Sequence, residues 1–533
     1  VFFFFGNSLI PLTDPDEVFY ALTAKEMAAK GEWLVPHIFN QPQFEKPIFI
    51  YWLLRLVFDW WGATPFSARL FPAFFACMGV LGVYALGLLG FFSERRAFWS
   101  ALVLCTGALF VGMGKTVFTD MVFSVFILYA LLSFYLAFVN PRRKLFGIMG
   151  FYFFAGLAVL TKGPLGLLLP ELTVILFLLY RGKLDFIYDR RVMGGFFLCL
   201  GIALPWYVFM INKYGHAFIH EFFYNDHWRR WLEAEHKGND RWFFYPLTMI
   251  MGLFPWSLFF IAGCVSMFKK LKWGASHFEY FILSWILVVF IIFHSAHSKL
   301  ASYILPLWPA LALLTGGFIE DALTNPRSRL VRVFLMIMSG VAFIFGIAIL
   351  AAYPVYQKYV PSILPAYFLS ALLIAFAGWL VILLLKEKLD AALRVLSLWL
   401  LPFLWTGFII RADIGPYISS FDAVQYLPYH PGQKAVILSS KPYARGIRYY
   451  TGQEMAVLNI NGGNYFSPHP LPILKNAQEL IQFIKEQKLT CAVLKKSGYK
   501  TINELLPADQ FKVHMIKNIG YNYVLTIEFL PAT

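Results

Sequence analysis

Long apolar segments separated by short polar connectors occupy the first 410 residues of the chain. A helix needs about 20 apolar residues to cross a bilayer, and by that measure the pattern predicts about thirteen membrane-spanning helices. We expect them near residues 1–11, 66–92, 97–113, 116–139, 145–161, 163–180, 192–211, 244–268, 278–295, 300–319, 331–353, 362–385 and 395–410. Because the first segment is short and has no basic region before it, we expect the sequence to begin inside a membrane helix and not at a signal peptide.

Basic residues are concentrated in alternate connectors, at positions 95–96, 142–144, 181–191, 269–272, 327–332 and 386–394. By the positive-inside rule these connectors are cytoplasmic. The loops 13–65 and 212–243, together with everything after residue 410, then share the opposite, extracytoplasmic side.

The last part of the chain, residues 411–533, has a different pattern. It is polar and contains the strand-like segments "KAVILSS" and "YVLTIEFL" and the helix-like segment "NAQELIQFIKEQKL". We therefore predict a polytopic α-helical membrane protein, with a transmembrane domain over 1–410 and a small extracytoplasmic α/β domain over 411–533.

Composition narrows the class of protein. The chain is 59% hydrophobic and 14% charged, with a mean hydropathy of +0.63, as in an integral membrane protein. The net charge of +15 does not indicate a nucleic-acid partner, because the basic residues lie between spans and form no stripe interleaved with aromatics. The five cysteines form no disulfide framework or CxxC site, and the absence of a nucleotide-binding glycine loop argues against an ATP-driven pump.

The first loop opens with Asp14-Pro15-Asp16-Glu17. This is a helix-start pattern, with Asp14 as N-cap and Glu17 closing a capping box, and it predicts an amphipathic helix that runs to about Lys30 along the membrane interface. Capping does not require Asp16, which is therefore a candidate functional acid.

Other charged residues are predicted at the outer ends of spans. Asp120 lies where charge is disfavoured, which makes it a candidate site residue, although a pair with Lys115 is the structural alternative. Lys162, Lys299 and Arg411 also lie at outer ends. One such cation is usually snorkelling, but several that converge can bind an anionic ligand such as a phosphate.

Two further stretches carry candidate chemistry. Glu45-Lys46 lies before an apolar segment, and an exposed ion pair worth about 0–1 kcal/mol is its simpler interpretation. The 212–243 loop is rich in His, acids, Arg and Trp, but it has no HExxH motif and so does not indicate a metalloprotease. Glu45 and His227 could still hold a divalent ion if the fold brings them together.

The order of these stretches resembles a known family. "PDEVFYALTAKEMAAKGEWLVPHI", "FEKPIFIYW", "TVFTDMVF", "LTKG", "FFYNDHWRRWLEAEHKGNDRWFFYP" and "SKLASYILPLWPALALL" are similar, in this order, to blocks of the bacterial aminoarabinose (lipid A) transferases and protein mannosyltransferase-like GT-C glycosyltransferases. The resemblance covers most of residues 13–315. It implies a bacterial inner-membrane enzyme with thirteen helices, a periplasmic active site and a periplasmic C-terminal domain. The implied donor is a polyprenyl-phosphate sugar, and the acceptor is lipid A, another glycolipid or a protein.

The resemblance also implies roles for particular residues. The cavity acids correspond to Asp16 and Asp120, the residues near a divalent metal such as zinc to Glu45 and His227, and the donor-phosphate residues to Lys46, Lys162, Lys299 and Tyr303. No nucleotide is implied. The chain departs from the aminoarabinose transferases at Phe19, where they usually have Arg, at Gln43, where they usually have Tyr, and at Asn225-Asp226-His227, where they have His-Glu-His.

These residues suggest inverting glycosyl transfer. Lysines would stabilise the leaving phosphate, and Asp16 would orient or deprotonate the acceptor. The alternatives are a transporter or flippase for an anionic lipid and a non-enzymatic scaffold. Transporters often show repeated halves, which this sequence lacks, and a scaffold gives no reason for Asp16 and Asp120 on one side.

Overall fold

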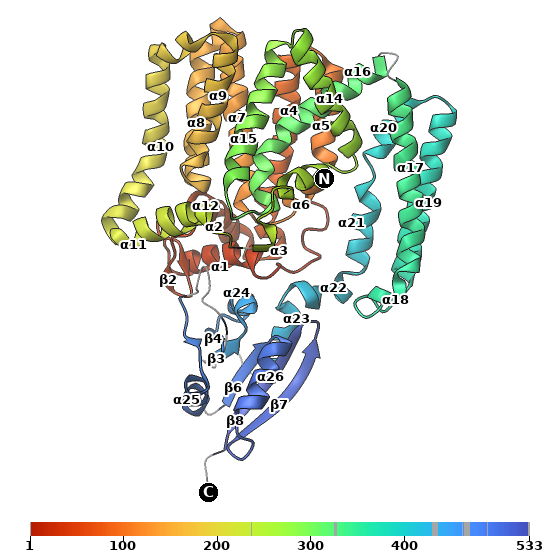
Figure 1. Ribbon diagram of the computed structural model, residues 1–533. Coiled ribbons are helices and arrows are strands. Elements are labelled where there is room, and N and C mark those ends of the chain that lie inside the picture. The colour runs from red at the N-terminus through yellow and green to blue at the C-terminus, as the bar shows by residue number, and fades with distance from the viewer. Residues whose placement is uncertain are drawn as a thin grey trace.

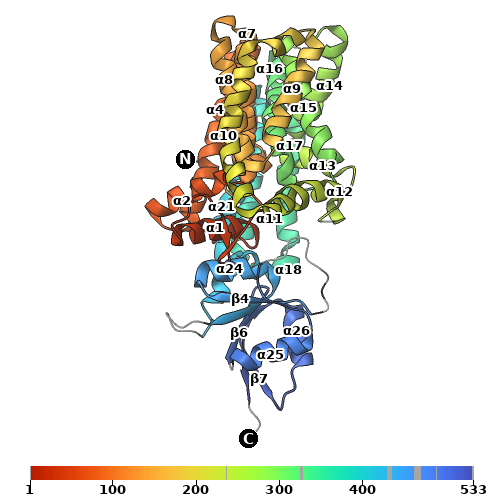
Figure 2. The ribbon, with the colours of Figure 1, turned by 90° about the vertical axis from the view of Figure 1, so that its left-hand side faces the viewer.

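The computed structural model describes residues 2–235, 237–324, 328–428, 435–460, 462, 470–487 and 489–530. Long helices stand side by side, shorter helices lie crosswise beneath one end of them, and a sheet domain lies below the short helices (Figures 1 and 2). The three parts follow from the three sequence patterns: long apolar segments, amphipathic loops and a polar tail.

Within the described ranges, nine helices are long and apolar enough to cross a membrane, or ten if one bent pair counts as a single span. This confirms the prediction of a polytopic helical membrane protein. The helices of this layer are α4 (Leu70–Phe91), α5 (Glu94–Thr106), α6 (Ala108–Met113), α7 (Thr119–Val139), α8 (Lys144–Lys162), α9 (Leu165–Arg181), α10 (Arg190–Tyr214), α13 (Phe244–Gly252), α14 (Ser257–Trp273), α15 (His277–Ser295), α16 (Trp308–Thr324), α17 (Ser328–Ala351), α19 (Leu364–Leu385), α20 (Leu389–Leu396) and α21 (Leu400–Ile409).

The count differs from the predicted thirteen where apolar segments are interrupted. Residues 2–10 form turns and a bend in place of the expected first helix. The 97–113 segment breaks between α5 and α6, because Gly107 is extended there with φ −71° and ψ 130°. α9 has only 17 residues. α13 and α14 meet at 117°, at a break that contains Pro255, which has no N–H to continue a helix.

Burial separates central from peripheral spans. In an 18-residue apolar window of the spans Thr119–Val139 and Ala301–Thr324, 67% and 89% of the window is buried, against 28% for Ser328–Ala351. The second of these central spans begins with the 3-10 helix Ala301–Leu307, which packs against α7. These two elements therefore form the centre of the membrane layer.

The crosswise layer comes from the two long loops. The first loop holds α1 (Asp16–Ala29), a hairpin of β1 (His37–Ile38) and β2 (Gln41–Pro42), α2 (Phe49–Trp61) and α3 (Pro65–Ala68). The second holds α11 (His216–Ile219), a π-helical segment over His220–Arg229, and α12 (Arg230–Leu232).

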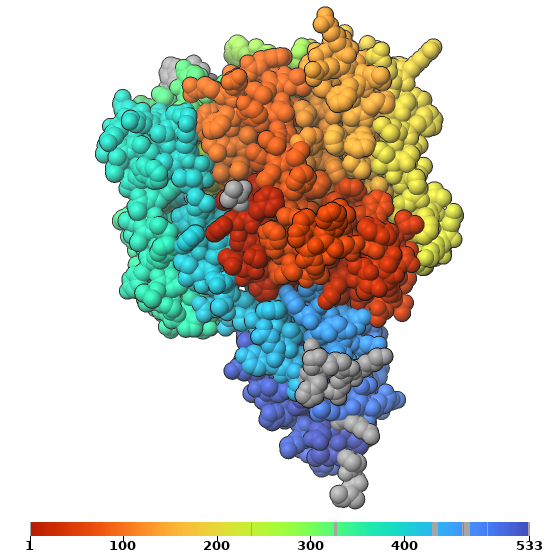
Figure 3. All heavy atoms as spheres, turned by 180° about the vertical axis from the view of Figure 1, so that it is seen from behind, coloured from red at the N-terminus to blue at the C-terminus, as the bar shows by residue number. Residues whose placement is uncertain are grey.

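The predicted amphipathic, interfacial character of the first helix is wrong. α1 has ten buried residues among its fourteen, since it packs between α2 and the tail helix α24 (Lys441–Thr451). Seen from behind, the first loop fills the space between the membrane helices and the tail domain (Figure 3).

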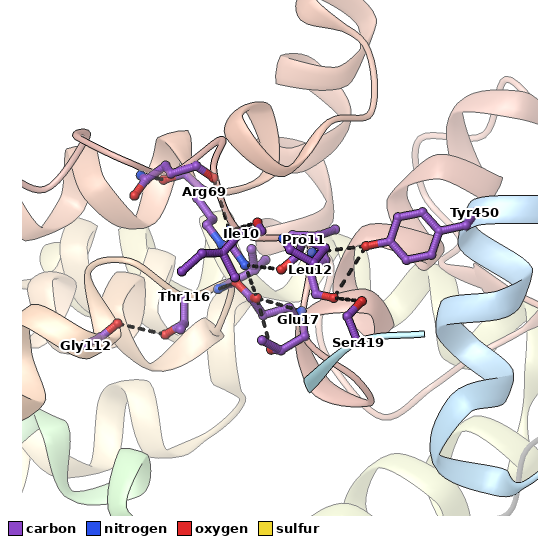
Figure 4. A network of polar contacts seen from close by, with 12 residues as sticks. Ile10, Pro11, Leu12, Glu17, Arg69, Gly112, Thr116, Ser419 and Tyr450 are labelled. Carbon is purple, nitrogen blue, oxygen red and sulfur yellow. Dashed lines mark hydrogen bonds and ion pairs between the residues drawn. The ribbon is translucent and has the colours of Figure 1, made fainter. Parts of the chain in front are cut away.

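The predicted capping box at Asp14 and Glu17 is also wrong. Pro15 stands at the N-cap of α1 without a side-chain cap, and Glu17 is buried against Arg69, whose Nε lies 2.8 Å from Glu17 Oε1. Arg69 also donates to the carbonyl oxygens of Ile10 and Pro11, which fixes the segment before α1 (Figure 4). Glu17 is thus a structural counter-ion.

The tail domain is built on one mixed sheet of six strands among the described residues, in the order β5-β4-β3-β6-β8-β7. β3, β4, β5 and β6 run parallel, and β8 pairs antiparallel with both β6 and β7. The remaining elements are α18 (Tyr353–Tyr356), α22 (Arg411–Ile418), α23 (Phe421–Val424), β3 (Val436–Ser439), β4 (Glu454–Leu458), β5 (Ile473–Leu474), α25 (Ala477–Gln487), β6 (Leu489–Leu494), α26 (Lys496–Leu505), β7 (Phe511–Ile519) and β8 (Asn522–Phe529).

Candidate active site

Asp120 and Lys162 form an ion pair at the tail-facing ends of two packed membrane helices. Asp120 is in the first turn of α7 and 2% exposed, and Lys162 is the last residue of α8. The Lys162 ammonium also lies 4.5 Å from the centre of the Tyr303 ring. Lys115 is not the partner of Asp120, because its amine donates to the carbonyl oxygen of Phe5 at 2.7 Å. The structure therefore brings three of the predicted site residues together.

A second cluster surrounds the carboxylate of Asp226 in the second loop. Lys46 Nζ donates to its two oxygens at 2.8 and 2.6 Å, and Arg230 Nη1 lies 3.0 Å from Oδ1. Arg230 also donates to the Tyr303 hydroxyl at 3.3 Å, which connects the two clusters. Burial raises the pKa of Asp226, but the charges of Arg230 and Lys46 outweigh it and lower the pKa to about 2. Asp226 is therefore ionised at neutral pH and joins the two loops.

Asp16 is exposed, in contrast to the buried residues of these two clusters. It is the first residue of α1 and is exposed, and Tyr20 follows one turn later. Burial and then the charge of Asp120 raise the pKa of the Tyr20 hydroxyl well above its ordinary value, and Asp16 acts in the same direction. Both predicted acids are thus within electrostatic reach of one buried hydroxyl.

Lys299 is bound apart from the other lysines. Its Nζ lies 2.7 Å from Asp240 Oδ1, and His297 Nδ1 lies 2.8 Å from the other oxygen of the same carboxylate. The hydrogen bond of Lys299 is the leading cause that lowers the pKa of Asp240. The backbone amide of Ser298 donates to the carbonyl oxygen of Arg230, so this segment is attached to the second loop. Arg411 does not join the site, since it is exposed and donates to the carbonyl oxygen of Phe408 in the preceding helix, α21.

The residues proposed to hold a metal have other partners. Glu45 lies 3.8 Å from Arg445, and the ring nitrogens of His227 lie 2.8 and 3.3 Å from the carbonyl oxygens of Phe222 and Lys162. A nitrogen that faces a carbonyl oxygen serves as a donor and cannot offer a lone pair to a metal. Across the described residues no group of three His, Cys, Asp or Glu side chains is placed to hold a metal ion. The present arrangement does not fit a metal centre.

Three residues of the site were not identified by sequence analysis. Asp226 and Arg230 stand four apart in a charge-rich loop, a spacing that brings side chains together on a helix and could have identified them. Arg445 gave no such signal, because its contact with Glu45 joins segments from opposite ends of the chain.

The arrangement suits an anionic head group that enters from the aqueous side. Lys46, Lys162 and Arg230 are largely buried, and each is bound to a carboxylate. Buried ion pairs are costly to form unless further hydrogen bonds satisfy them, and a bound anion can take the place of a carboxylate partner. Acids, tyrosine hydroxyls and cations lie together here beneath the central spans.

Comparison with known proteins identifies the class. A family model of dolichyl-phosphate-mannose-protein mannosyltransferases matches residues 45–209. The crystal structure of ArnT from Cupriavidus metallidurans bound to undecaprenyl phosphate has a TM-score of 0.78 to this chain at 20% identity, and the match covers 99% of this chain and 96% of that one. The fold is therefore that of the GT-C membrane glycosyltransferases.

Curated relatives give the family. The undecaprenyl phosphate-alpha-4-amino-4-deoxy-L-arabinose arabinosyl transferase of Serratia proteamaculans is 31% identical over 390 residues, covering 70% of this chain and 68% of that protein. A transferase of the same name, numbered 2, from Pseudomonas fluorescens is 27% identical over 415 residues, covering 75% and 68%. The chain belongs to the family of undecaprenyl phosphate-aminoarabinose arabinosyl transferases. This confirms the predicted family, fold class and enzyme class.

Proposed function

We propose that this glycosyltransferase moves 4-amino-4-deoxy-L-arabinose from an undecaprenyl-phosphate donor to lipid A at the outer face of the inner membrane. The observation that carries the proposal is the set of buried cations contributed by the end of α8 and by the two long loops in a chain of this family. The outward position of the site rests on the basic connectors, which place the opposite ends of the helices in the cytoplasm.

The donor phosphate would bind among Lys46, Lys162 and Arg230. When the bond between the anomeric carbon and the phosphate oxygen breaks, its electron pair stays on the phosphate, and the negative charge there increases. Cations that are already positioned and desolvated stabilise this charge better than mobile water does. Lys162 is held at this position by Asp120, and Lys46 by Asp226.

The acceptor oxygen would attack the opposite face of the sugar ring, which inverts the anomeric configuration. Asp16 faces the aqueous side and is the acid best placed to orient the acceptor. A hydroxyl acceptor must lose its proton, and Asp16 would take it. A phosphate acceptor is already anionic near neutral pH and needs only orientation. Asp120 is committed to Lys162 and so serves as its positioning partner.

A divalent metal stays a prediction, with Glu45 and His227 as its expected ligands. The contacts of both residues in this structure do not favour it, so no step above depends on a metal.

The direct test is sugar transfer by the full-length protein in proteoliposomes. Labelled undecaprenyl-phosphate aminoarabinose is supplied with lipid A, and mass spectrometry identifies the product. We expect lipid A that is heavier by one aminoarabinose. Transfer of a different sugar, or to a different glycolipid or a protein, would refute the specificity, and folded wild-type protein without transfer would refute the activity.

A further inference from the structure

The tail helix α24 packs against α1 beside the site. Lys25 Nζ on α1 donates to the carbonyl oxygen of Tyr449 at 2.6 Å, and Arg448 Nε donates to Glu26 at 3.0 Å. Between these contacts and the site, Gly446 lies directly on Asp14, where a Cβ would come within 2.2 Å of Asp14 Oδ1. Only glycine permits so close an approach, so α24 is held firmly against the start of α1.

This docking places Arg445 at the rim of the site. Its guanidinium carbon lies 4.4 Å from the centre of the Phe19 ring, one turn after Asp16 on α1. Its Nη2 lies 3.8 Å from Glu45 Oε1, next to Lys46 in the chain. The side chain of Arg445 is only 12% exposed.

Arg445 is bound more loosely than the other cations of the site. Lys46, Arg230 and Lys299 have carboxylate oxygens at 2.6, 3.0 and 2.7 Å. Within the part of the chain that the structure describes, Arg445 has one carboxylate contact, which is 3.8 Å long, and its buried Nε has no hydrogen-bond partner. A guanidinium has five N–H donors, and a buried donor without a partner costs about 1–3 kcal/mol.

We propose that Arg445 is a substrate-binding residue that the tail domain contributes to the active site, where it takes a phosphate group. This inference rests on the proposed function, whose donor and acceptor both carry phosphate. A guanidinium binds phosphate with two parallel hydrogen bonds, which would satisfy the unused donors. Lys441, one turn earlier on α24, adds to the positive charge of the same helix face.

Glu45 then has a defined part in binding. In this structure Glu45 is a weak counter-ion to Arg445, at 3.8 Å. A phosphate oxygen at hydrogen-bond distance is a stronger partner than a carboxylate at 3.8 Å. Phosphate therefore replaces Glu45 at the guanidinium.

The test measures binding by the full-length protein in lipid nanodiscs, so that it does not depend on transfer. The probes are undecaprenyl phosphate, undecaprenol, lipid A and dephosphorylated lipid A. The variants are Arg445→Gln and Arg445→Lys, with Arg448→Gln as control, because Arg448 lies on the same helix and pairs with Glu26 outside the site.

We expect Arg445→Gln to weaken the binding of one phosphorylated probe about tenfold or more and to leave the affinity for its dephosphorylated analogue unchanged. Arg445→Lys should cause a smaller loss of affinity for the same phosphorylated probe. A loss confined to undecaprenyl phosphate assigns the donor phosphate, and a loss confined to lipid A assigns the acceptor phosphate. Unchanged affinity for both phosphorylated probes overturns the proposal. Equal loss for all four probes, matched by Arg448→Gln, also overturns it, because Arg445 would then only hold the tail in place. If wild-type protein binds these probes but transfers no aminoarabinose, the proposed function fails and Arg445 is still tested.

Discussion

Lys46 and Asp226, which stand 180 residues apart in the chain, meet with Nζ 2.6 Å from Oδ2. Lys46 belongs to the first loop and Asp226 to the second, and their side chains are 14% and 9% exposed. Arg230 shares the same carboxylate. This ion pair joins the two loops, and the contact of the Phe44 and Phe218 rings, 5.6 Å apart, joins them as well.

Removal of the Asp226 charge is expected to destabilise the site. Asp226→Asn leaves Lys46 and Arg230 buried beside a neutral amide, and breaking a buried ion pair costs about 3–5 kcal/mol. Thermal unfolding in detergent should show a clear fall in Tm. Glu233→Gln is the matched control, because Glu233 pairs with Arg229 but is 60% exposed, and exposed pairs contribute about 0–1 kcal/mol. Equal Tm values for the two variants would contradict this role.

Lys162→Met is expected to lower kcat about 10²-fold, since loss of one preorganised electrostatic donor typically costs about 10²–10³ in rate. Lys115→Met is the comparison, because the Lys115 amine binds backbone carbonyls and not the site. The measurement is the initial rate of sugar transfer per amount of folded protein for both variants. Similar rates for both variants would remove Lys162 from the chemistry.

Substitution of the two neighbouring acids Asp16 and Glu17 on α1 should affect different quantities, kcat for the first and Tm for the second. Asp16→Asn should lower kcat with little change in Tm, because Asp16 is exposed, and general-base catalysis contributes about 10²–10⁴ in rate. Glu17→Gln should lower Tm, because it breaks the buried pair with Arg69. Paired measurements of rate and unfolding check both. Full activity of Asp16→Asn on a hydroxyl acceptor would exclude a role for Asp16 as base.

The docking of the tail domain should depend on pH through Asp14. Burial raises the pKa of Asp14 to about 7, against an ordinary value of about 4. The docked protein therefore binds more protons than the undocked one between pH 4 and 7, so docking weakens as pH rises through this range and levels off above it. Hydrogen exchange of α24 against pH measures this, and Asp14→Asn should abolish the dependence. If the variant keeps the pH profile of the wild type, the pH dependence of docking comes from another titratable group.

The sequence predicted the parts of the fold that depend on local pattern. Apolar segments of bilayer length became α7, α10 and α17, and the strand-like segment "YVLTIEFL" lies in β8. The α5–α6 break at Gly107 and the turns over residues 2–10 were not predicted, because hydropathy alone does not show where a helix is interrupted.

The candidate site was predictable as a set of residue types but not as a set of pairs. Asp120 was identified because charge at the end of a span is costly, and Lys162 because several cations at outer ends can bind an anion, yet their pairing depends on how α7 packs on α8. The burial of α1 was missed for the same reason, since part of its cover comes from α24, where Tyr449 accepts from Lys25 more than 400 positions earlier in the chain. Arg445 belongs to that cover.

The ion pair between Lys46 and Asp226 can form only after residue 226 has been synthesised. The ribosome synthesises the first loop long before residue 226. Lys46 therefore has no Asp226 carboxylate to pair with while several membrane spans are inserted. Arg445 is synthesised later still. With the proposed role of Arg445, the site is complete only after residue 445 has been synthesised, and a chain terminated before residue 226 leaves Lys46 without its carboxylate partner.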